Sequence, residues 1–254
     1  MRMKSIIAAA AVALVAPMSA ALADTTPAAG VKNIVIVPDA FVDGSGWRVV
    51  HDILIHKGYH VQVVQERFLT LDDDVSITNE IIRQQPGATL LVGHGYGGAV
   101  VSIAGARGKV KGLVYVDAVQ PDVGEAVSQI LASVPEPNTD IITNRDGRLF
   151  FNPAKFAADY AGDLTTNRTD FMAASQVPAT TAAFGGLSLV AAWRTKPSYA
   201  VVATDDRFLS PDLQRSMYKR AGSKVTEIKA SHAVYISQPE AVAAVIEEAA
   251  LAAK

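Results

Sequence analysis

Short apolar and β-branched runs alternate along the chain with segments in which apolar residues recur at helical spacing. Continuous short runs of this kind are typical of strands buried on both faces of a parallel sheet. Their alternation with helices predicts an α/β fold, a doubly wound and mostly parallel sheet with helices on both faces. We expect strands at 33–37, 60–64, 89–92, 112–116, 199–203 and 225–228, and helices at about 47–57, 72–85, 97–106, 211–221 and 239–252.

The stretch from 121 to about 197 interrupts this alternation and contains several prolines and many aromatic residues. We expect it to form a helical insertion, or cap, laid over the carboxyl edge of the sheet. Its aromatic residues could line an apolar pocket, but a small subdomain also needs aromatics for its own core, and for any one of them the core is favoured. These residues are Phe150, Phe151, Phe156, Tyr160, Phe171, Phe184 and Trp193.

The first residues are typical of a signal peptide. Arg2 and Lys4 precede a short apolar run at 5–15, and Ala21-Leu22-Ala23 fits an A-x-A cleavage site. The run is shorter than the roughly 20 residues of a membrane span, and no twin-arginine pair precedes it. We therefore expect a Sec-exported protein, periplasmic or secreted, with a signal peptide at 1–23 and one domain at 24–254.

The composition removes several kinds of chemistry. The chain has no cysteine, which excludes a disulfide framework, a thiol nucleophile and a thiolate metal site. It carries 23 basic and 25 acidic residues, a net charge of −2, without a basic cluster. A nucleic-acid or membrane partner is therefore not expected. We expect a small-molecule substrate, no cofactor and no metal, and the sequence does not fix the oligomeric state.

Two glycine motifs overlap directly after the run at 89–92. Gly93, Gly95 and Gly98 spell G-x-G-x-x-G, the dinucleotide-binding turn, and Asp117 lies near the spacing of a ribose-binding acid. The same stretch, GHGYGG, fits the nucleophile elbow G-x-S-x-G with Gly95 in place of the serine. The dinucleotide motif normally lies in the first strand–helix unit, yet two units precede it here. An exported protein would also find NAD scarce.

Distant residues favour the elbow. Asp206 follows the strand at 199–203, and His232 follows the strand at 225–228. The order from Gly95 to Asp206 to His232 is that of a nucleophile, acid and histidine triad, and carboxyl ends of parallel strands are where such sheets place ligands. Asp205 stays open as an alternative acid.

With these residues in place, the chain resembles the α/β-hydrolase superfamily and is similar to its small-esterase branch, which includes plant salicylate methylesterases and hydroxynitrile lyases. The resemblance implies that His232 is the general base and that Asp206 orients it. By position it assigns the oxyanion hole to the N–H groups of Ala40 and Tyr96, and we place Phe41 and Trp193 among the substrate-binding residues. The stretches that carry the resemblance are 41–47, 71–75, the elbow, 113–116, 206–207, 231–233 and 238–239.

The sequence departs from that family at two points. Gly95 has no side chain, so no acyl-enzyme can form there, although a strained elbow suits glycine. Relatives carry His-Gly after the first strand, whereas this chain has Pro38-Asp39, which places a carboxylate near the expected oxyanion. We consider Asp39 a possible acid or base. Ser45, Ser102 and Ser231 have simpler turn, helix or cap roles, and His94, His232 and Asp39 do not follow a metal-binding spacing.

Three functions remain open. The first is an enzyme in which His232 and Asp206 act directly as a general base, hydrolysing a small apolar ester, lactone or diketone, or catalysing an elimination. The second is a non-catalytic binder of apolar ligands, and the third is a serine esterase whose nucleophile was removed by engineering. Retention of both triad partners favours the enzyme, and Pro38-Asp39 disfavours a single engineered change. We expect hydrolysis of simple esters to be weak.

Overall fold

The computed structural model describes residues 30–135 and 138–253, so the predicted signal peptide lies outside the described residues. A six-stranded sheet in the order β2-β1-β3-β4-β8-β9 forms the centre, and every neighbouring pair is parallel. This confirms the predicted α/β fold. The strands are β1 (Asn33–Val37), β2 (His60–Val63), β3 (Thr89–Gly95), β4 (Val110–Ala118), β8 (Ser198–Ala203) and β9 (Lys224–Ile228).

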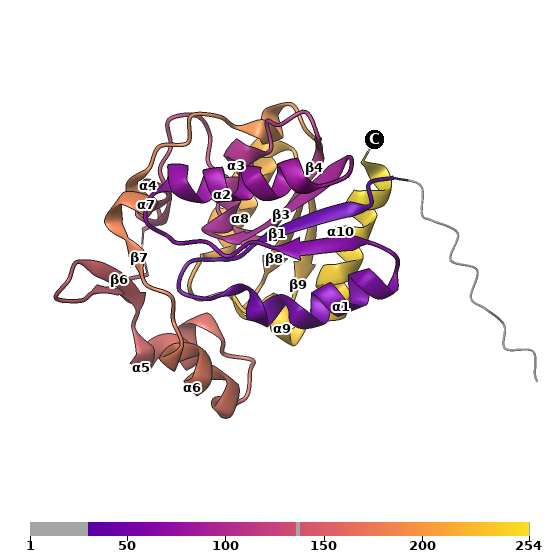
Figure 1. The fold of residues 1–254 in the computed structure, drawn as a ribbon. Coiled ribbons are helices and arrows are strands. Elements are labelled where there is room, and N and C mark those ends of the chain that lie inside the picture. Colours follow the sequence, from indigo (N-terminus) through magenta and orange to yellow (C-terminus); the bar gives the residue numbers. More distant parts are fainter. Residues whose placement is uncertain (1–29, 136–137, 254) are drawn as a thin grey trace, which may run out of the picture.

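Side chains alternate between the two faces of the sheet, and both faces are buried. Ile34 and Ile36 join one hydrophobic cluster, whereas Val35 and Val37 join the other. Figure 1 shows α1, α9 and α10 on one side of the sheet and α2, α3 and α8 on the other. These helices are α1 (Arg48–His56), α2 (Leu71–Gln84), α3 (Gly97–Ala104), α8 (Pro211–Ala221), α9 (Val234–Ser237) and α10 (Pro239–Ala252). None of the helices in the described ranges is long and apolar enough to cross a membrane.

Helix α2 begins at Leu71, one residue before the expected range of 72–85. The hydroxyl of Thr70 accepts the N–H of Asp73, so Thr70 is the N-cap. Asp72 and Asp73 lie in the first turn, where negative charge favours the helix. The third aspartate, Asp74, is buried and points inward.

The insertion at 121–197 is not purely helical, which corrects the prediction of a helical cap. It contains a three-stranded antiparallel sheet in the order β5-β6-β7 as well as short helices. The Asn144 side chain accepts the N–H groups of Asp146 and Arg148, and Gly147 has φ +75°, so a tight turn joins β5 to β6. Figure 1 shows β6, β7, α5 and α6 beside the sheet, at the side away from the C-terminus. The elements are α4 (Val127–Leu131), β5 (Ile141–Thr143), β6 (Arg148–Phe151), α5 (Pro153–Lys155), the π-helical turn η2 (Phe156–Tyr160), α6 (Thr166–Ala174), β7 (Ala179–Thr180), α7 (Thr181–Gly185) and the 3₁₀ turn η3 (Ala192–Arg194).

Candidate active site

A sharp turn joins β3 to α3 at Gly95 and Tyr96. Gly95 has φ +52°, in the left-handed region that glycine adopts without strain. Its carbonyl accepts the N–H of Val119, at the end of β4. A Cβ on Gly98 would lie 2.0 Å from the Val119 carbonyl oxygen. The glycines therefore permit close packing of the elbow against the loop after β4, which accounts for the G-x-G-x-x-G pattern without a dinucleotide.

The carboxylate of Asp39 fills the position that a nucleophilic side chain on the elbow would take. Asp39 lies in the loop after β1 and is buried. A Cβ on Gly95 would lie 2.0 Å from both Cγ and Oδ1 of Asp39. Oδ1 of Asp39 accepts the N–H of Tyr96 at 2.5 Å. One predicted oxyanion-hole donor is thus already occupied by a carboxylate of the chain itself.

His232 lies between two carboxylates. Its Nδ1 is 2.7 Å from Oδ2 of Asp206, and its Nε2 is 3.2 Å from Oδ2 of Asp39. Asp206, rather than Asp205, is therefore the acid that contacts the histidine. Asp206 is fixed in turn by the N–H groups of Phe208 and Leu209, both at 2.9 Å, and by the side-chain amide of Gln214 at 2.8 Å.

The two carboxylates determine the charge of His232. Burial disfavours the imidazolium, but the charges and hydrogen bonds of Asp206 and Asp39 outweigh burial and raise the pKa of His232 to about 10. Burial alone would raise the pKa of Asp39, yet its hydrogen bond and attraction to His232 lower it below its usual value. At neutral pH, His232 is a cation that donates to both carboxylates. It cannot accept a proton in this state, which differs from the general-base role that the resemblance implies.

Two further buried groups surround His232. Burial lowers the pKa of His94 to about 3, and the neutral ring donates from Nε2 to the His232 carbonyl at 2.9 Å. Burial and the nearby charge of Asp206 raise the pKa of Asp117 well above its usual value, and its Oδ1 accepts the Ala203 N–H at 2.6 Å.

Ligating atoms of Asp39, His94 and His232 lie within 4.8 Å of one another. Hydrogen bonds already engage Nε2 of both histidines, which accounts for this cluster without a metal.

Tyr160 of the insertion also reaches the site, and sequence analysis did not assign it there. The turn η2 places its hydroxyl 3.0 Å from Oδ2 of Asp39, to which it donates. Burial keeps the pKa of Tyr160 well above its usual value, so the phenol stays protonated. Its membership of the aromatic set in the insertion was the only sequence pattern that pointed to it.

Of the residues predicted to bind the substrate or oxyanion, Ala40 and Phe41 lie near the elbow and Trp193 does not. Ala40 and Phe41 are buried next to Asp39, and the Phe41 ring stacks on Phe184 with centroids 5.7 Å apart. Trp193 does not join the site, which corrects its assignment to substrate binding. Its indole N–H donates to the Pro121 carbonyl at 2.8 Å, and Arg194 lies over its ring. Ser45, Ser102 and Ser231 are each engaged in local hydrogen bonds.

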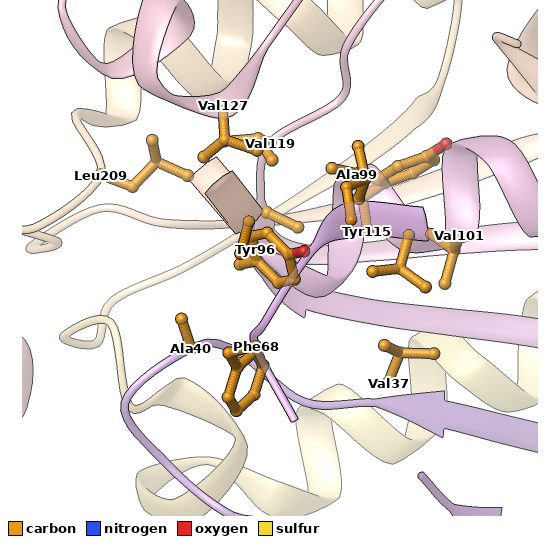
Figure 2. Packing of buried hydrophobic residues seen from close by; sticks show 14 of the residues in the cluster. Val37, Ala40, Phe68, Tyr96, Ala99, Val101, Tyr115, Val119, Val127 and Leu209 are labelled. Atoms are coloured by element: carbon orange, nitrogen blue, oxygen red, sulfur yellow. The ribbon is translucent and has the colours of Figure 1, made fainter. Parts of the chain in front are cut away.

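A small apolar cavity adjoins Asp39 and Gly95. Figure 2 shows Tyr96 in this region, with Val119, Val127 and Leu209 on one side. Its volume is about 10 Å³, which is room for about one water molecule and far below the roughly 300–1,000 Å³ of pockets for drug-sized ligands. Two of its lining residues, Leu131 and Phe184, also line a larger and more open apolar pocket of about 370 Å³. The inner cavity and the outer pocket therefore adjoin at these two side chains.

Comparison with known proteins identifies the family of this chain. The model of the alpha/beta hydrolase family matches residues 15–245, and the chain belongs to this family. A search of curated proteins returned no match.

Solved structures of esterases and related hydrolases share the fold. A pyrethroid hydrolase from Sphingobium faniae JZ-2 is 25% identical with a TM-score of 0.72, over 87% of this chain and 98% of that chain. Polyneuridine aldehyde esterase is 17% identical with a TM-score of 0.72, over 85% and 98%. The methylesterase MES16 from Arabidopsis is 16% identical with a TM-score of 0.71, over 86% and 98%. The family match confirms the predicted membership of the α/β-hydrolase superfamily, and the likeness to the two esterases shows a shared fold.

Proposed function

We propose that this chain hydrolyses small apolar esters, or lactones and diketones of similar size, without a serine nucleophile. The observation that carries the proposal is the row of Asp39, His232 and Asp206, joined by contacts of 3.2 and 2.7 Å beside an apolar cavity. Withdrawing a cation and two carboxylates from water costs free energy that their mutual attraction and hydrogen bonds must offset. Buried ionisable groups of this kind concentrate at functional sites.

The charge states assign different roles to the two reacting groups. Protonated His232 can donate a proton to the leaving oxygen of a substrate. Asp39 is the acidic side chain among the described residues that line the cavity, and it can accept a proton or attack. Asp206 keeps the imidazolium oriented. The Tyr96 N–H already donates to Asp39 and is not free to donate to the oxyanion of the transition state. The transition state is therefore less stabilised, and we expect slow turnover.

The surrounding surface supports an apolar substrate. The cavity beside Asp39 is lined by valine, leucine and phenylalanine side chains, and it adjoins the larger apolar pocket across Leu131 and Phe184. The names of the structural neighbours, a pyrethroid hydrolase and two esterases, support an ester as the substrate class.

The test compares native protein with His232→Gln, Asp39→Asn and Asp205→Asn against aryl esters, lactones and diketones. Asp205 neighbours the triad acid but is not the aspartate that contacts His232, so its variant controls for loss of local charge. We expect native turnover to fall at least 100-fold in the first two variants, within the usual range for acid–base catalysts, and to persist in the control. Turnover that survives His232→Gln would contradict the proposal.

A ligand-binding protein without catalysis is the second candidate. It is favoured by the closed state of the site, because the His232 side chain is fully buried and Asp39 is 1% exposed. Saturable binding of an apolar ester, followed by quenching of intrinsic fluorescence, would identify this function if the bound ester stays intact over hours. The mutual fit of Gly95 and Asp39 disfavours the third possibility, a single engineered loss of serine.

We also propose that the protein is exported. The support is the pattern of Arg2, Lys4 and the alanine-rich cleavage site, which lies outside the described residues. Expression in a bacterial host followed by N-terminal sequencing of the periplasmic fraction should give a chain that starts at Asp24. A cytoplasmic product that starts at Met1 would contradict export.

A further inference from the structure

The two carboxylate oxygens of Asp39 contact the two groups that serve a serine nucleophile in a hydrolase triad, the histidine and an oxyanion-hole N–H. Oδ2 is 3.2 Å from Nε2 of His232, the ring nitrogen that faces away from Asp206. Oδ1 accepts a hydrogen bond at 2.5 Å from the Tyr96 N–H, which is the predicted oxyanion-hole donor. A Cβ on Gly95 would lie 2.0 Å from the Asp39 Cγ, so the carboxylate and an elbow side chain exclude each other.

From this geometry we propose that Asp39 is itself the nucleophile, transferred from the elbow to the loop after β1. The proposal rests on the hydrolase function above and specifies its chemistry: a covalent acyl intermediate forms on Oδ2 of Asp39. Gly95 is then the residue that makes room for this carboxylate. A nucleophile of this kind needs no activation by a base, because the carboxylate is already ionised.

The first step conserves charge within the site. Oδ2 attacks the ester carbonyl carbon, the bond from that carbon to the alcohol oxygen breaks, and His232 gives its Nε2 proton to the departing alkoxide. An alcohol leaves, and a mixed anhydride joins Asp39 to the acyl group. His232 is then neutral at Nε2 and can accept a proton. Tyr160, whose hydroxyl donates to Oδ2 at 3.0 Å, orients the attacking oxygen.

The second step restores the starting state. Neutral His232 takes a proton from water, and the hydroxide attacks Cγ of Asp39. The negative charge then develops on Oδ1, which already accepts the Tyr96 N–H, so the donor stabilises this intermediate. The bond from Cγ to Oδ2 breaks, and the acyl group leaves as a carboxylate that carries Oδ2. The new Asp39 acid gives its proton to this departing carboxylate, so Asp39 is again ionised and keeps one water oxygen, while His232 is again the cation.

Other described candidates for a nucleophile are engaged elsewhere. The Ser102 hydroxyl donates to the Gly98 carbonyl and contacts Tyr115. The Ser231 hydroxyl donates to Asp163. Oδ1 of Asp117 accepts the Ala203 N–H, and burial raises the pKa of Asp117 well above its usual value. Asp39 is the carboxylate that combines a lowered pKa, contact between its Oδ2 and Nε2 of His232, and a place in the lining of the cavity.

The first arm of the test is a single turnover in ¹⁸O-water, with native protein in excess over phenyl acetate. Proteolysis and mass spectrometry then locate the label. We expect one ¹⁸O on the peptide that contains Asp39 and none in the acetate from that first turnover. Acetate that carries ¹⁸O, together with an unlabelled Asp39 peptide, would overturn the nucleophile while leaving the hydrolase function intact, because water would then have attacked the substrate directly.

The second arm does not require ester turnover. Styrene oxide in ¹⁸O-water is a probe for carboxylate nucleophiles: Oδ2 attacks a ring carbon, the carbon–oxygen bond opens, and His232 protonates the released oxygen. We expect the Asp39 peptide to carry either the hydroxyalkyl ester or, after its hydrolysis, ¹⁸O. Neither mark should be found on the same peptide of Asp39→Asn, and Asp205→Asn should be marked like the native chain.

The two arms separate the proposals. A marked Asp39 in styrene oxide without turnover of any ester supports the nucleophile and rejects the proposed substrate class. An unmarked Asp39 peptide in native protein overturns the nucleophile whatever the ester result.

Discussion

At the scale of single residues, Gly95 and Asp39 share one volume. A side chain on Gly95 would begin 2.0 Å from the Asp39 Cγ, a distance at which two unbonded carbon atoms cannot remain. The carboxylate, conversely, is fixed where it is by the Tyr96 N–H and the Tyr160 hydroxyl. Restoring the serine alone therefore does not restore a serine hydrolase, because the pair has to be exchanged together.

We predict that Gly95→Ser destabilises the fold by about 1–3 kcal/mol, the usual effect of overpacking a buried site, and does not react with a fluorophosphonate. Asp39→Gly combined with Gly95→Ser relieves the clash and frees the Tyr96 N–H. This double variant should be more stable than Gly95→Ser and should be labelled at the new serine. Urea unfolding and phosphonate labelling of native, single and double variants measure both effects. Equal labelling of Gly95→Ser and the double variant would show that Asp39 does not block the position.

The charge of His232 gives a second prediction at this scale. Its pKa of about 10 in the folded chain lies above its unfolded value of 6.5. Its contribution to stability is therefore fully present below about pH 6.5 and is lost as the pH rises through about 10. In Asp39→Asn one of two carboxylate partners is gone, so the pKa of His232 should fall. Imidazole NMR titration of native, Asp39→Asn and Asp205→Asn measures this, and an unchanged midpoint in Asp39→Asn would show that Asp39 does not stabilise the cation.

Sequence reasoning reached part of this site. Asp206 and His232 were found because triad residues follow strand ends in a fixed order, and the elbow was found from its glycines. Asp39 was expected near the oxyanion, but its contacts with Tyr96 and His232 could not be predicted, because contact between the loop after β1 and the turn after β3 arises only when the parallel strands pair. The protonation of His232 was also out of reach, since it depends on burial together with two carboxylates from distant segments.

At the scale of elements, a buried carboxyl pair connects the start of α2 to the elbow. Asp74 accepts the N–H groups of Arg67 and Phe68, both at 3.1 Å, and the Tyr96 hydroxyl at 2.9 Å. Glu66 accepts the Thr78 hydroxyl at 2.9 Å. Burial, followed by the charge of Asp74, raises the pKa of Glu66 to about 9. Glu66 is therefore protonated at neutral pH and supports the helix that holds Tyr96 in place.

We predict that Glu66→Gln makes the fold less sensitive to alkaline pH. The folded pKa of Glu66 is raised above its unfolded value of 4.5, so its contribution to stability is present below about pH 4.5 and is lost as the pH rises through about 9. Glutamine keeps the acceptor for Thr78 but does not ionise. Urea unfolding between pH 6 and pH 9 should show a smaller loss of free energy in the variant than in native protein. Parallel curves for the two proteins would show that Glu66 does not titrate in this range.

The elements also differ in how well the sequence predicted them. Helices α8 and α10 begin at Pro211 and Pro239, as predicted, because proline suits the first helical turn. The insertion was harder, since its strands are only two to four residues long and too short for a clear alternating pattern. Its turn at 144–147 contains asparagine, aspartate and glycine, which is the one local indication of a hairpin there.

At the scale of the whole molecule, the insertion closes the site. Tyr160 and Phe184 come from the insertion, whereas Asp39, Gly95 and His232 come from the sheet and its loops. The reacting groups are thereby withdrawn from solvent, which strengthens their electrostatic interactions. Because the inner cavity holds no more than about one water molecule, a substrate reaches Asp39 from the outer pocket only when the side chains that line both, Leu131 and Phe184, move apart.

Leu131 is the side chain best placed to test this passage, because it lines both the inner cavity and the outer pocket and is only half-buried. We predict that Leu131→Ala raises kcat/KM for phenyl hexanoate relative to phenyl acetate by about tenfold, or roughly 1.4 kcal/mol, because the acyl chain gains room. Leu189→Ala removes the same atoms from a leucine that is 70% exposed in the same insertion, and it should leave the ratio unchanged. A ratio that shifts equally in both variants, or in neither, would place the route to Asp39 elsewhere.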